Sequence, residues 1–313
     1  MVQRSGCKHR SRVRTVMDWC RLAAKGFAMG AADLVPGVSG GTVAFIAGIY
    51  DELLSTIAGL GIETLKDLSK LGVKKVWSKY NFSFLAVLGL GLISAVIALS
   101  GSIHWLQVQY PTELRAFFFG LVIASAPILA REVRLTKVRK YVMVLFGIAI
   151  AVMITSLPPA VQSDSPLFLC ISGAIAICAM LLPGISGSFI LLILGAYTPV
   201  ITALSTFDVL RIGAFAVGAF AGLLSFSRLL TSILKKYHST TIALLTGFLL
   251  GSLHVLWPWK RKIEILYTHS DGRAEWLLGN TLPDFSPTDM MPIIFSVTLG
   301  ALLVTALDRY SRT

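Results

Sequence analysis

Two short phrases of proline, glycine and serine carry the most chemistry in this sequence. One reads PGVSGGT at residues 36–42, and the other reads PGISGSF at residues 183–189. Proline disfavours helix at the residue before it and glycine tolerates positive φ, so each phrase breaks a helix. Ser39 and Ser186 are good N-caps for helices that start directly after them. Such helix starts offer backbone N–H groups and a positive dipole end, which suit phosphate or carboxylate.

The surroundings of both phrases are apolar, which decides how they can be used. A broken helix exposes backbone groups that lipid does not satisfy, so it is tolerated where it lines a cavity enclosed by protein. Gly40, Gly41 and Gly187 let a ligand approach the backbone closely. The alternative is that these small residues serve close helix packing. Because the phrase occurs twice, we favour an anion site formed by both copies.

Three further charges are candidates for the same chemistry. Asp33 lies three residues before Pro36 in an apolar stretch, where it either carries a proton or orients the tip, or caps a neighbouring helix. Arg228 reaches a phosphate in one interpretation and extends to the cytoplasmic interface in the other, and we favour the phosphate. Arg115 lies near the external face, where it suits the steering of an anion.

The composition is typical of a multi-pass membrane protein. The 313 residues are 55% hydrophobic and 14% charged, with a mean hydropathy of +0.75. We assign the net charge of +12 to cytoplasmic loops rather than to nucleic-acid binding, for which no motif is present. The four cysteines form no CxxC pair, and the sequence predicts neither a metal site nor a cofactor.

The positions of the basic residues predict the topology. Residues 1–25 form a basic cytoplasmic arm that lies on anionic lipid, without a cleavage site for a signal peptide. Segments 26–57 and 167–204 start and end on the same face and are too short for two crossings, so we expect two re-entrant hairpins. The polar loop 258–288 is external and is the weakest part of this assignment. The predicted membrane spans are 82–103, 114–130, 141–157, 209–232, 240–257 and 290–307.

The chain is predicted to be a duplication. Residues 34–50 align without gaps on residues 181–197, Tyr110 aligns with Tyr237, and the last spans pair Phe146 with Phe295. Each half, 26–157 and 166–313, is then one hairpin plus three spans. Three crossings are an odd number, so the second half is inverted relative to the first. The expected fold is an all-α polytopic membrane protein of two inverted repeats, with a substrate site at their interface.

At these residues the sequence resembles the polyprenyl-phosphate transporter family (PopT-like), once known only as a domain of unknown function. The matching phrases lie between residues 29 and 259 and are MGAADLVPGVSGGTVAFIAGIYDELL, AFFFGLVIAS, AICAMLLPGISGSFILLILGAY, FSRLL and GSLHVLWPW. The resemblance implies a flippase in a bacterial or archaeal plasma (inner) membrane, and the positions of the basic residues predict that both termini are cytoplasmic. It implies that undecaprenyl phosphate returns from the outer to the inner leaflet, which recycles the carrier lipid of envelope polymer synthesis.

The resemblance also implies which residues hold the phosphate. Carried onto this sequence, they are Pro36, Gly37, Ser39, Gly40, Gly41, Thr42, Pro183, Gly184, Ser186, Gly187 and Ser188, with Arg228 nearby. The expected mechanism is alternating access, with the phosphate between the two tips and the prenyl tail in lipid. Asp33 is the first candidate for coupling to a proton, and a coupling cation is the alternative.

Two other functions are weighed against transport. Undecaprenyl-pyrophosphate phosphatases of the BacA type carry a similar PGxSRSxxT phrase, but Gly40 and Gly187 stand where that phrase has arginine. The sequence also has no cluster of membrane carboxylates, so phosphoryl transfer lacks its main stabiliser. A small-anion channel or exchanger would use the same helix ends, and the sequence leaves this alternative open.

Overall fold

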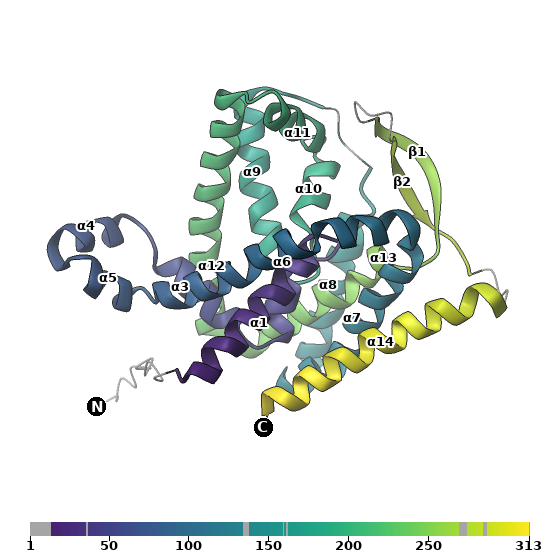
Figure 1. The fold of residues 1–313 in the computed structure, drawn as a ribbon, viewed down its shortest axis with the longest axis horizontal. Helices are drawn as coiled ribbons and strands as arrows, with labels where there is room; N and C mark the ends of the chain where they lie inside the picture. The colour runs from purple at the N-terminus through teal and green to yellow at the C-terminus, as the bar shows by residue number, and fades with distance from the viewer. Residues whose placement is uncertain are drawn as a thin grey trace.

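The protein is an assembly of helices with one short β ribbon (Figure 1). The structure is a computed structural model that describes residues 14–35, 37–133, 138–158, 160, 162–268, 274–283 and 287–312. Residues 1–13 of the predicted N-terminal arm lie outside these residues, and so does Pro36, whereas residues 16–25 of that arm belong to the first helix, Val16–Asp33. The mostly helical, multi-pass class predicted from composition is confirmed.

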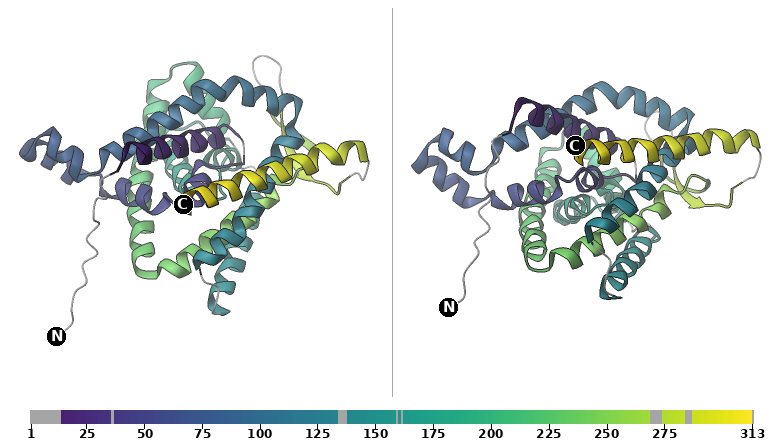
Figure 2. Two further views of the ribbon diagram at one scale, coloured as in Figure 1. Left: turned by 60° about the horizontal axis from the view of Figure 1, so that its bottom comes forward. Right: turned by 90° about the horizontal axis from the view of Figure 1, so that it is seen from below.

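The described residues of the first half form eight helices. They are α1 (Val16–Asp33), α2 (Gly40–Ile46), α3 (Tyr50–Gly59), α4 (Ile62–Leu71), α5 (Val73–Lys79), α6 (Phe82–Gln109), α7 (Pro111–Val133) and α8 (Val138–Thr155). Helix α1 begins at a capping box, in which Thr15 and Asp18 satisfy each other's backbone N–H groups. The lysine-rich pair α4–α5 projects from the body in every view (Figures 1 and 2).

The second half repeats this order without the lysine-rich pair. Its elements are α9 (Pro166–Leu181), α10 (Gly187–Ile193), α11 (Tyr197–Ser205), α12 (Val209–Gly251), α13 (Leu253–Leu256), β1 (Lys260–Thr268), β2 (Ala274–Asn280) and α14 (Pro287–Arg312). Helices α2 and α3 are bent by 119° at their junction, and α10 and α11 by 107°. Each bent pair is either a broken span or a re-entrant loop.

The predicted spans coincide with helices to within about two residues at their ends, but not one to one. Four helical segments of the described chain are long and apolar enough to cross a membrane: α6, α8, most of α7, and α12 continued through α13. Two predicted spans follow each other in α12, which changes direction at Tyr237 (φ −132°, ψ 41°; Figure 2). The aligned Tyr110, which follows α6, has nearly the same backbone angles (φ −132°, ψ 51°). The last predicted span, 290–307, lies in α14, whose apolar segment Met290–Ala306 is short for a full span.

The loop 258–288 contains two strands that the all-α prediction did not include. Here β1 and β2 form an antiparallel ribbon, with Lys260 opposite Asn280 and Thr268 opposite Ala274. Isoleucine, tyrosine and threonine in KIEILYT favour a strand, and the charged residues between them hide this signal in a count of polar residues. The ribbon lies beside α13 (Figure 1).

Glycine sets the packing of the first two long helices in both halves. Helix α1 packs on α6, and α9 packs on the first part of α12. At matched positions a glycine faces the backbone of the partner helix, so any larger residue would force the helices apart. The matched contacts are Gly26 with Leu88 and Gly173 with Phe215, and Gly91 with Ala23 and Gly218 with Cys170.

The remaining long helices interlock the two halves. Helix α7 packs on α14, and α8 packs on the second part of α12, so each half covers part of the other. The matched contacts are Gly120 with Val297 and Gly247 with Val144, and Gly300 with Phe117 and Gly147 with Leu244. These contacts pair Gly147 with Gly300, so the predicted pairing of Phe146 with Phe295 is wrong by about one helical turn.

Candidate functional site

The two glycine-serine phrases meet in the structure. Hydrogen bonds join the first phrase and the start of α3 to the end of α9 and the second phrase. They run from Ser39 Oγ to the Met180 carbonyl (3.0 Å), from the Gly184 N–H to Thr42 Oγ1 (2.8 Å), and from the Tyr50 hydroxyl to the Leu181 carbonyl (2.7 Å). Ser39, Thr42 and Tyr50 are buried. We call residues 37–42 the first tip and residues 183–188 the second tip.

Both tips have the backbone conformation that their glycines allow. Gly37 and Gly184 have φ values of 85° and 87°, a region that other residues rarely adopt. Space is restricted too, because a Cβ on Gly184 would lie 2.5 Å from the Phe248 carbonyl oxygen. A Cβ on Gly37 would lie 2.8 Å from Val255 Cγ1. The phrase therefore specifies the shape of each tip as well as its chemistry.

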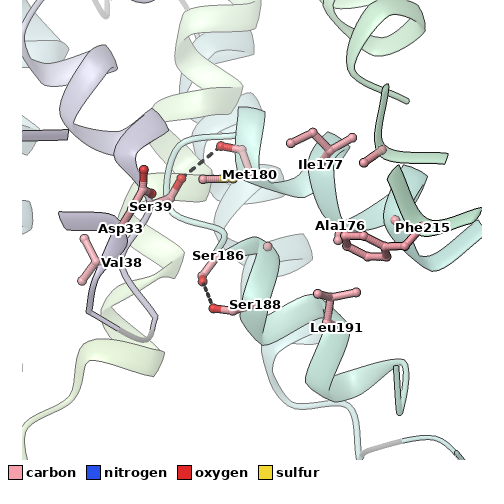
Figure 3. A pocket seen from close by; sticks show the side chains of 13 residues that line it. Asp33, Val38, Ser39, Ala176, Ile177, Met180, Ser186, Ser188, Leu191 and Phe215 are labelled. Carbon is pink, nitrogen blue, oxygen red and sulfur yellow. Dashed lines mark hydrogen bonds between the residues drawn. The ribbon is translucent and has the colours of Figure 1, made fainter. Parts of the chain in front are cut away.

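A cavity of about 310 Å³ lies where the tips meet (Figure 3). Its polar wall contains Asp33, Ser39, Ser186 and Ser188, with the backbone of Gly187. Its apolar wall comes from Val38, α9, α10 and the first part of α12. The residues of this apolar wall are Val38, Gly173, Ala176, Ile177, Met180, Leu191, Phe215 and Ala219.

The first tip already holds a carboxyl group of the chain itself. Asp33 Oδ1 accepts a hydrogen bond from the Gly40 N–H at 2.6 Å, and the Gly41 N–H donates to Ser39 Oγ at 3.1 Å. The Thr42 N–H donates to the Ser39 carbonyl at 2.9 Å. The start of α2 therefore has no free N–H group at its first three positions. Asp33 also explains why position 40 is glycine, because a Cβ there would lie 2.5 Å from Asp33 Oδ2.

The second tip differs from the first at this point. Met180 occupies the position aligned with Asp33, so no carboxylate reaches the start of α10. The Ser186 hydroxyl bonds to Ser188 Oγ at 2.9 Å and does not cap the helix. In the described part of the chain, no acceptor is found for the N–H groups of Gly187 and Ser188. These N–H groups border the cavity, and an anion is the partner that suits them.

Arg228 does not line the cavity, in contrast to the sequence expectation. Its Nε donates to the Ala58 carbonyl at 3.2 Å and its Nη2 to the Leu60 carbonyl at 2.5 Å. These carbonyls lie at the C-terminal end of α3, where a cation is favourable. In this conformation Arg228 joins α3 to α12 instead of contacting the tips.

The other predicted residues support the tips. Pro183 is fully buried, and a Cβ on Gly41 would lie 2.7 Å from the Met180 carbonyl oxygen. Tyr50 was not predicted as a site residue, although its repetition at Tyr197 was a signal in the sequence. Over the residues that the structure describes, no group of histidine, cysteine, aspartate or glutamate side chains could hold a metal ion.

A multi-pass helical protein in which two interrupted helices meet at a small polar cavity has the construction of a secondary transporter. The chain belongs to the family described as VCA0040-like, undecaprenyl phosphate translocase-like, whose family model matches residues 29–274.

Two curated relatives agree with this family. A polyprenyl-phosphate transporter of Vibrio cholerae is 39% identical over 302 residues, which cover 94% of this chain and 98% of the relative. A polyprenyl-phosphate transporter of Staphylococcus aureus is 34% identical over 253 residues, which cover 75% of this chain and 84% of the relative. No solved structure matches the chain.

Proposed function

We propose that this protein transports polyprenyl phosphate, with undecaprenyl phosphate as the expected lipid, from the outer to the inner leaflet of the plasma membrane. The phosphate binds in the cavity between the tips, and the lipid returns to the carrier pool for envelope polymers. The observation that carries this proposal is the meeting of the tips at a cavity bordered by the uncapped start of α10. The names of the relatives support a transporter and not an enzyme.

The proposed architecture is a pair of inverted repeats, each with a re-entrant hairpin and three spans. The bent pairs α2–α3 and α10–α11 are the inner parts of the hairpins, and their tips enter from opposite faces. The matched glycine contacts support a duplicated fold, because they recur pair by pair in both halves. An odd number of spans per half makes the repeats inverted and places both termini in the cytoplasm.

The proposed mechanism is alternating access, and the asymmetry between the halves supports it. Helix α3 packs on α12, through Arg228 and through the pair of Asp51 Oδ2 with His238 Nε2 at 3.1 Å. The corresponding helices α11 and α6, whose residues are all described, do not pack on each other in this way. Exchanging the two conformations would open the α3 side and close the α11 side. The cavity would then face the opposite leaflet.

Asp33 is the proposed coupling residue, because it occupies the first tip. A phosphate that contacts the start of α2 must first displace this carboxyl group, and protonation makes the displacement easier. Moving an anion inward works against the membrane potential by about 2.3 kcal/mol per charge per 100 mV. A proton that enters with the lipid offsets part of this free energy. A coupling cation is the alternative carrier.

The test is transport by the Ser39→Ala, Ser186→Ala double variant in proteoliposomes that contain polyprenyl phosphate. We expect the rate of movement between leaflets to fall about ten-fold or more, because both hydroxyls border the cavity. The matched control is Ser205→Ala, Ser225→Ala, whose exposed hydroxyls donate only to carbonyls of their own helices.

A normal rate in the double variant of Ser39 and Ser186 would refute the proposed site. The same vesicles separate the other functions. Release of phosphate from a polyprenyl pyrophosphate would identify an enzyme. Flux of chloride or inorganic phosphate without movement of lipid would identify an anion channel or exchanger.

A further inference from the structure

Two cations lie together at the end of α13, outside the cavity between the tips. Arg115 of α7 donates from Nε and Nη2 to the Pro258 carbonyl, both at 3.3 Å. Lys260 of β1 donates from Nζ to the His254 carbonyl at 3.2 Å, and also to Asn280 Oδ1. Both side chains are therefore held against the segment 254–258 by neutral acceptors.

These two cations carry no ion pair within the part of the chain that the structure describes. Glu113 is close enough to interact electrostatically with Arg115 but does not contact it. Arg115 and Lys260 are half-buried. Burial and the neighbouring Arg115 lower the pKa of Lys260 to about 8. Over the described residues, these two like charges lie together without an ion pair of their own, an arrangement more often functional than stabilising.

An aromatic surface adjoins these cations. Phe119 and Trp257 pack edge to face with ring centroids 5.8 Å apart, and Trp257 and Trp259 are 5.2 Å apart. The Trp257 Nε1 donates to the Thr281 carbonyl at 2.8 Å. Tryptophan with one apolar face and one bonded N–H is characteristic of the boundary between lipid and water. A charged headgroup beside this surface would leave its hydrocarbon tail in lipid.

The same segment also borders the first tip. Val255 lies in α13 and contacts Gly37, so that a Cβ on this glycine would meet Val255 Cγ1 at 2.8 Å. One short helix therefore separates the two cations from the first tip.

We propose that Arg115 and Lys260 form a second phosphoryl-binding site, which receives the phosphate headgroup at the β-ribbon face before it reaches the tips. The planar guanidinium retains donors beyond the two that bond Pro258, and the ammonium is a compact point charge with a third donor, so together they suit a phosphate monoester. The choice of a lipid as the source of that phosphate rests on the proposed function. The site itself rests on the geometry of the two cations.

The experiment measures binding and transport by the Arg115→Gln, Lys260→Gln variant of the full chain. Radiolabelled polyprenyl phosphate in nanodiscs is one probe, and inorganic phosphate is the other. We expect the lipid Kd and the transport KM to rise about ten-fold, because two charge-assisted hydrogen bonds are lost. The maximal rate should stay within about two-fold, since the tips are intact. Loss of the cavity would instead lower the maximal rate, so the two proposals fail separately.

The control variant is Arg261→Gln, Lys262→Gln, which removes two exposed charges from the same strand. Equal Kd and KM values in both variants would overturn the second site. Weakened binding of inorganic phosphate in the Arg115→Gln, Lys260→Gln variant would show that free phosphate also binds at the second site. Thermal stability in detergent reports folding, and the charge-retaining Arg115→Lys, Lys260→Arg variant should keep affinity within about three-fold.

Discussion

Asp33 and Met180 occupy equivalent positions, and this one difference makes the two tips chemically unlike. The carboxyl group of Asp33 accepts from the Gly40 N–H and so behaves as an internal substitute for the anion. The second tip has no such group, and its Ser186 hydroxyl hydrogen-bonds to Ser188 Oγ. A phosphate that enters the cavity thus meets available donors at α10 first. It can contact α2 only after Asp33 has moved.

The Asp33→Asn substitution tests this competition at the scale of one residue. The amide oxygen still accepts from Gly40, but it has no charge, so a phosphate displaces it more easily. We expect tighter lipid binding by about three-fold to ten-fold and transport that no longer responds to collapse of the proton gradient. Proteoliposomes with and without a protonophore provide the measurement. The control is Asp164→Asn, because Asp164 is exposed and pairs with Arg211 at 2.5 Å. Unchanged gradient dependence in Asp33→Asn would remove Asp33 as the coupling residue.

Several helices in this protein pack so closely that a glycine of one helix contacts the backbone of the next. Gly91 and Gly218 are matched, and each faces the backbone of the helix that precedes the bent pair of its half. On the same helices Gly89 and Gly213 have open space at the Cβ position. The presence of a glycine therefore does not by itself identify the contact face. Its position along the helix decides whether it meets a partner helix.

Substitution by alanine should have opposite effects on stability at a glycine that faces a partner helix and at a glycine with open space around it. Gly218→Ala should lower the free energy of unfolding by about 1–3 kcal/mol, because a Cβ meets the Cys170 backbone. Gly213→Ala should be neutral or stabilising by up to about 1 kcal/mol, because alanine has the higher helix propensity. Gly91→Ala and Gly89→Ala should repeat this contrast in α6. Thermal unfolding in one detergent measures all four, and equal midpoints within either pair would contradict the packing.

The elements show what the sequence could and could not predict. Apolar runs and positive charges located the long apolar helices and the segments of both bent pairs, because these are local signals, but they did not predict helices α4 and α5 in the lysine-rich linker. The register of the last helices was missed, since it depends on Gly147 and Gly300 facing the opposite half, and the identical Phe146 and Phe295 suggested a different pairing.

The site shows the same limit. Ser39 and Ser186 were predicted because they lie in repeated phrases. The hydrogen bonds of Arg228 to Ala58 and Leu60 were not predicted, because these partners are about 170 residues away in the chain. No local pattern relates such distant residues, so only the fold could show which end of α3 this cation meets.

The whole molecule has two halves of similar construction in different arrangements. Helix α3 is joined to α12 by Arg228 and by the pair of Asp51 with His238. The alignment of the halves makes Gly101 of α6 the counterpart of Arg228 and Ser205 of α11 the counterpart of Ala58. At Gly101 the surface of α6 has a hollow of about 450 Å³, lined also by Ser102, Trp105 and Leu106. If the halves exchange conformations, α11 approaches this hollow and α3 leaves α12.

Cysteine cross-linking tests this exchange in a chain whose four native cysteines are replaced. A short, reducible thiol-specific linker between Asp51→Cys and His238→Cys should stop nearly all transport, because α3 can no longer leave α12. Reduction should restore the rate. The control pair is Asp164→Cys with Arg211→Cys, an exposed and a half-buried position at the paired ends of α9 and α12. Normal transport with the first pair linked would exclude movement of α3 from the cycle.

The complementary pair, Gly101→Cys with Ser205→Cys, should behave in the opposite way. In the conformation described here α11 does not pack on α6, so these cysteines should cross-link slowly in vesicles that lack substrate. Addition of polyprenyl phosphate populates the exchanged conformation, and the yield should rise with the transport rate. A linker that traps this pair should in turn reduce linking of α3 to α12, since one chain cannot close both sides at once. Equal yields with and without substrate would mean that the asymmetry of the halves is a fixed property of the fold, not one state of a transport cycle.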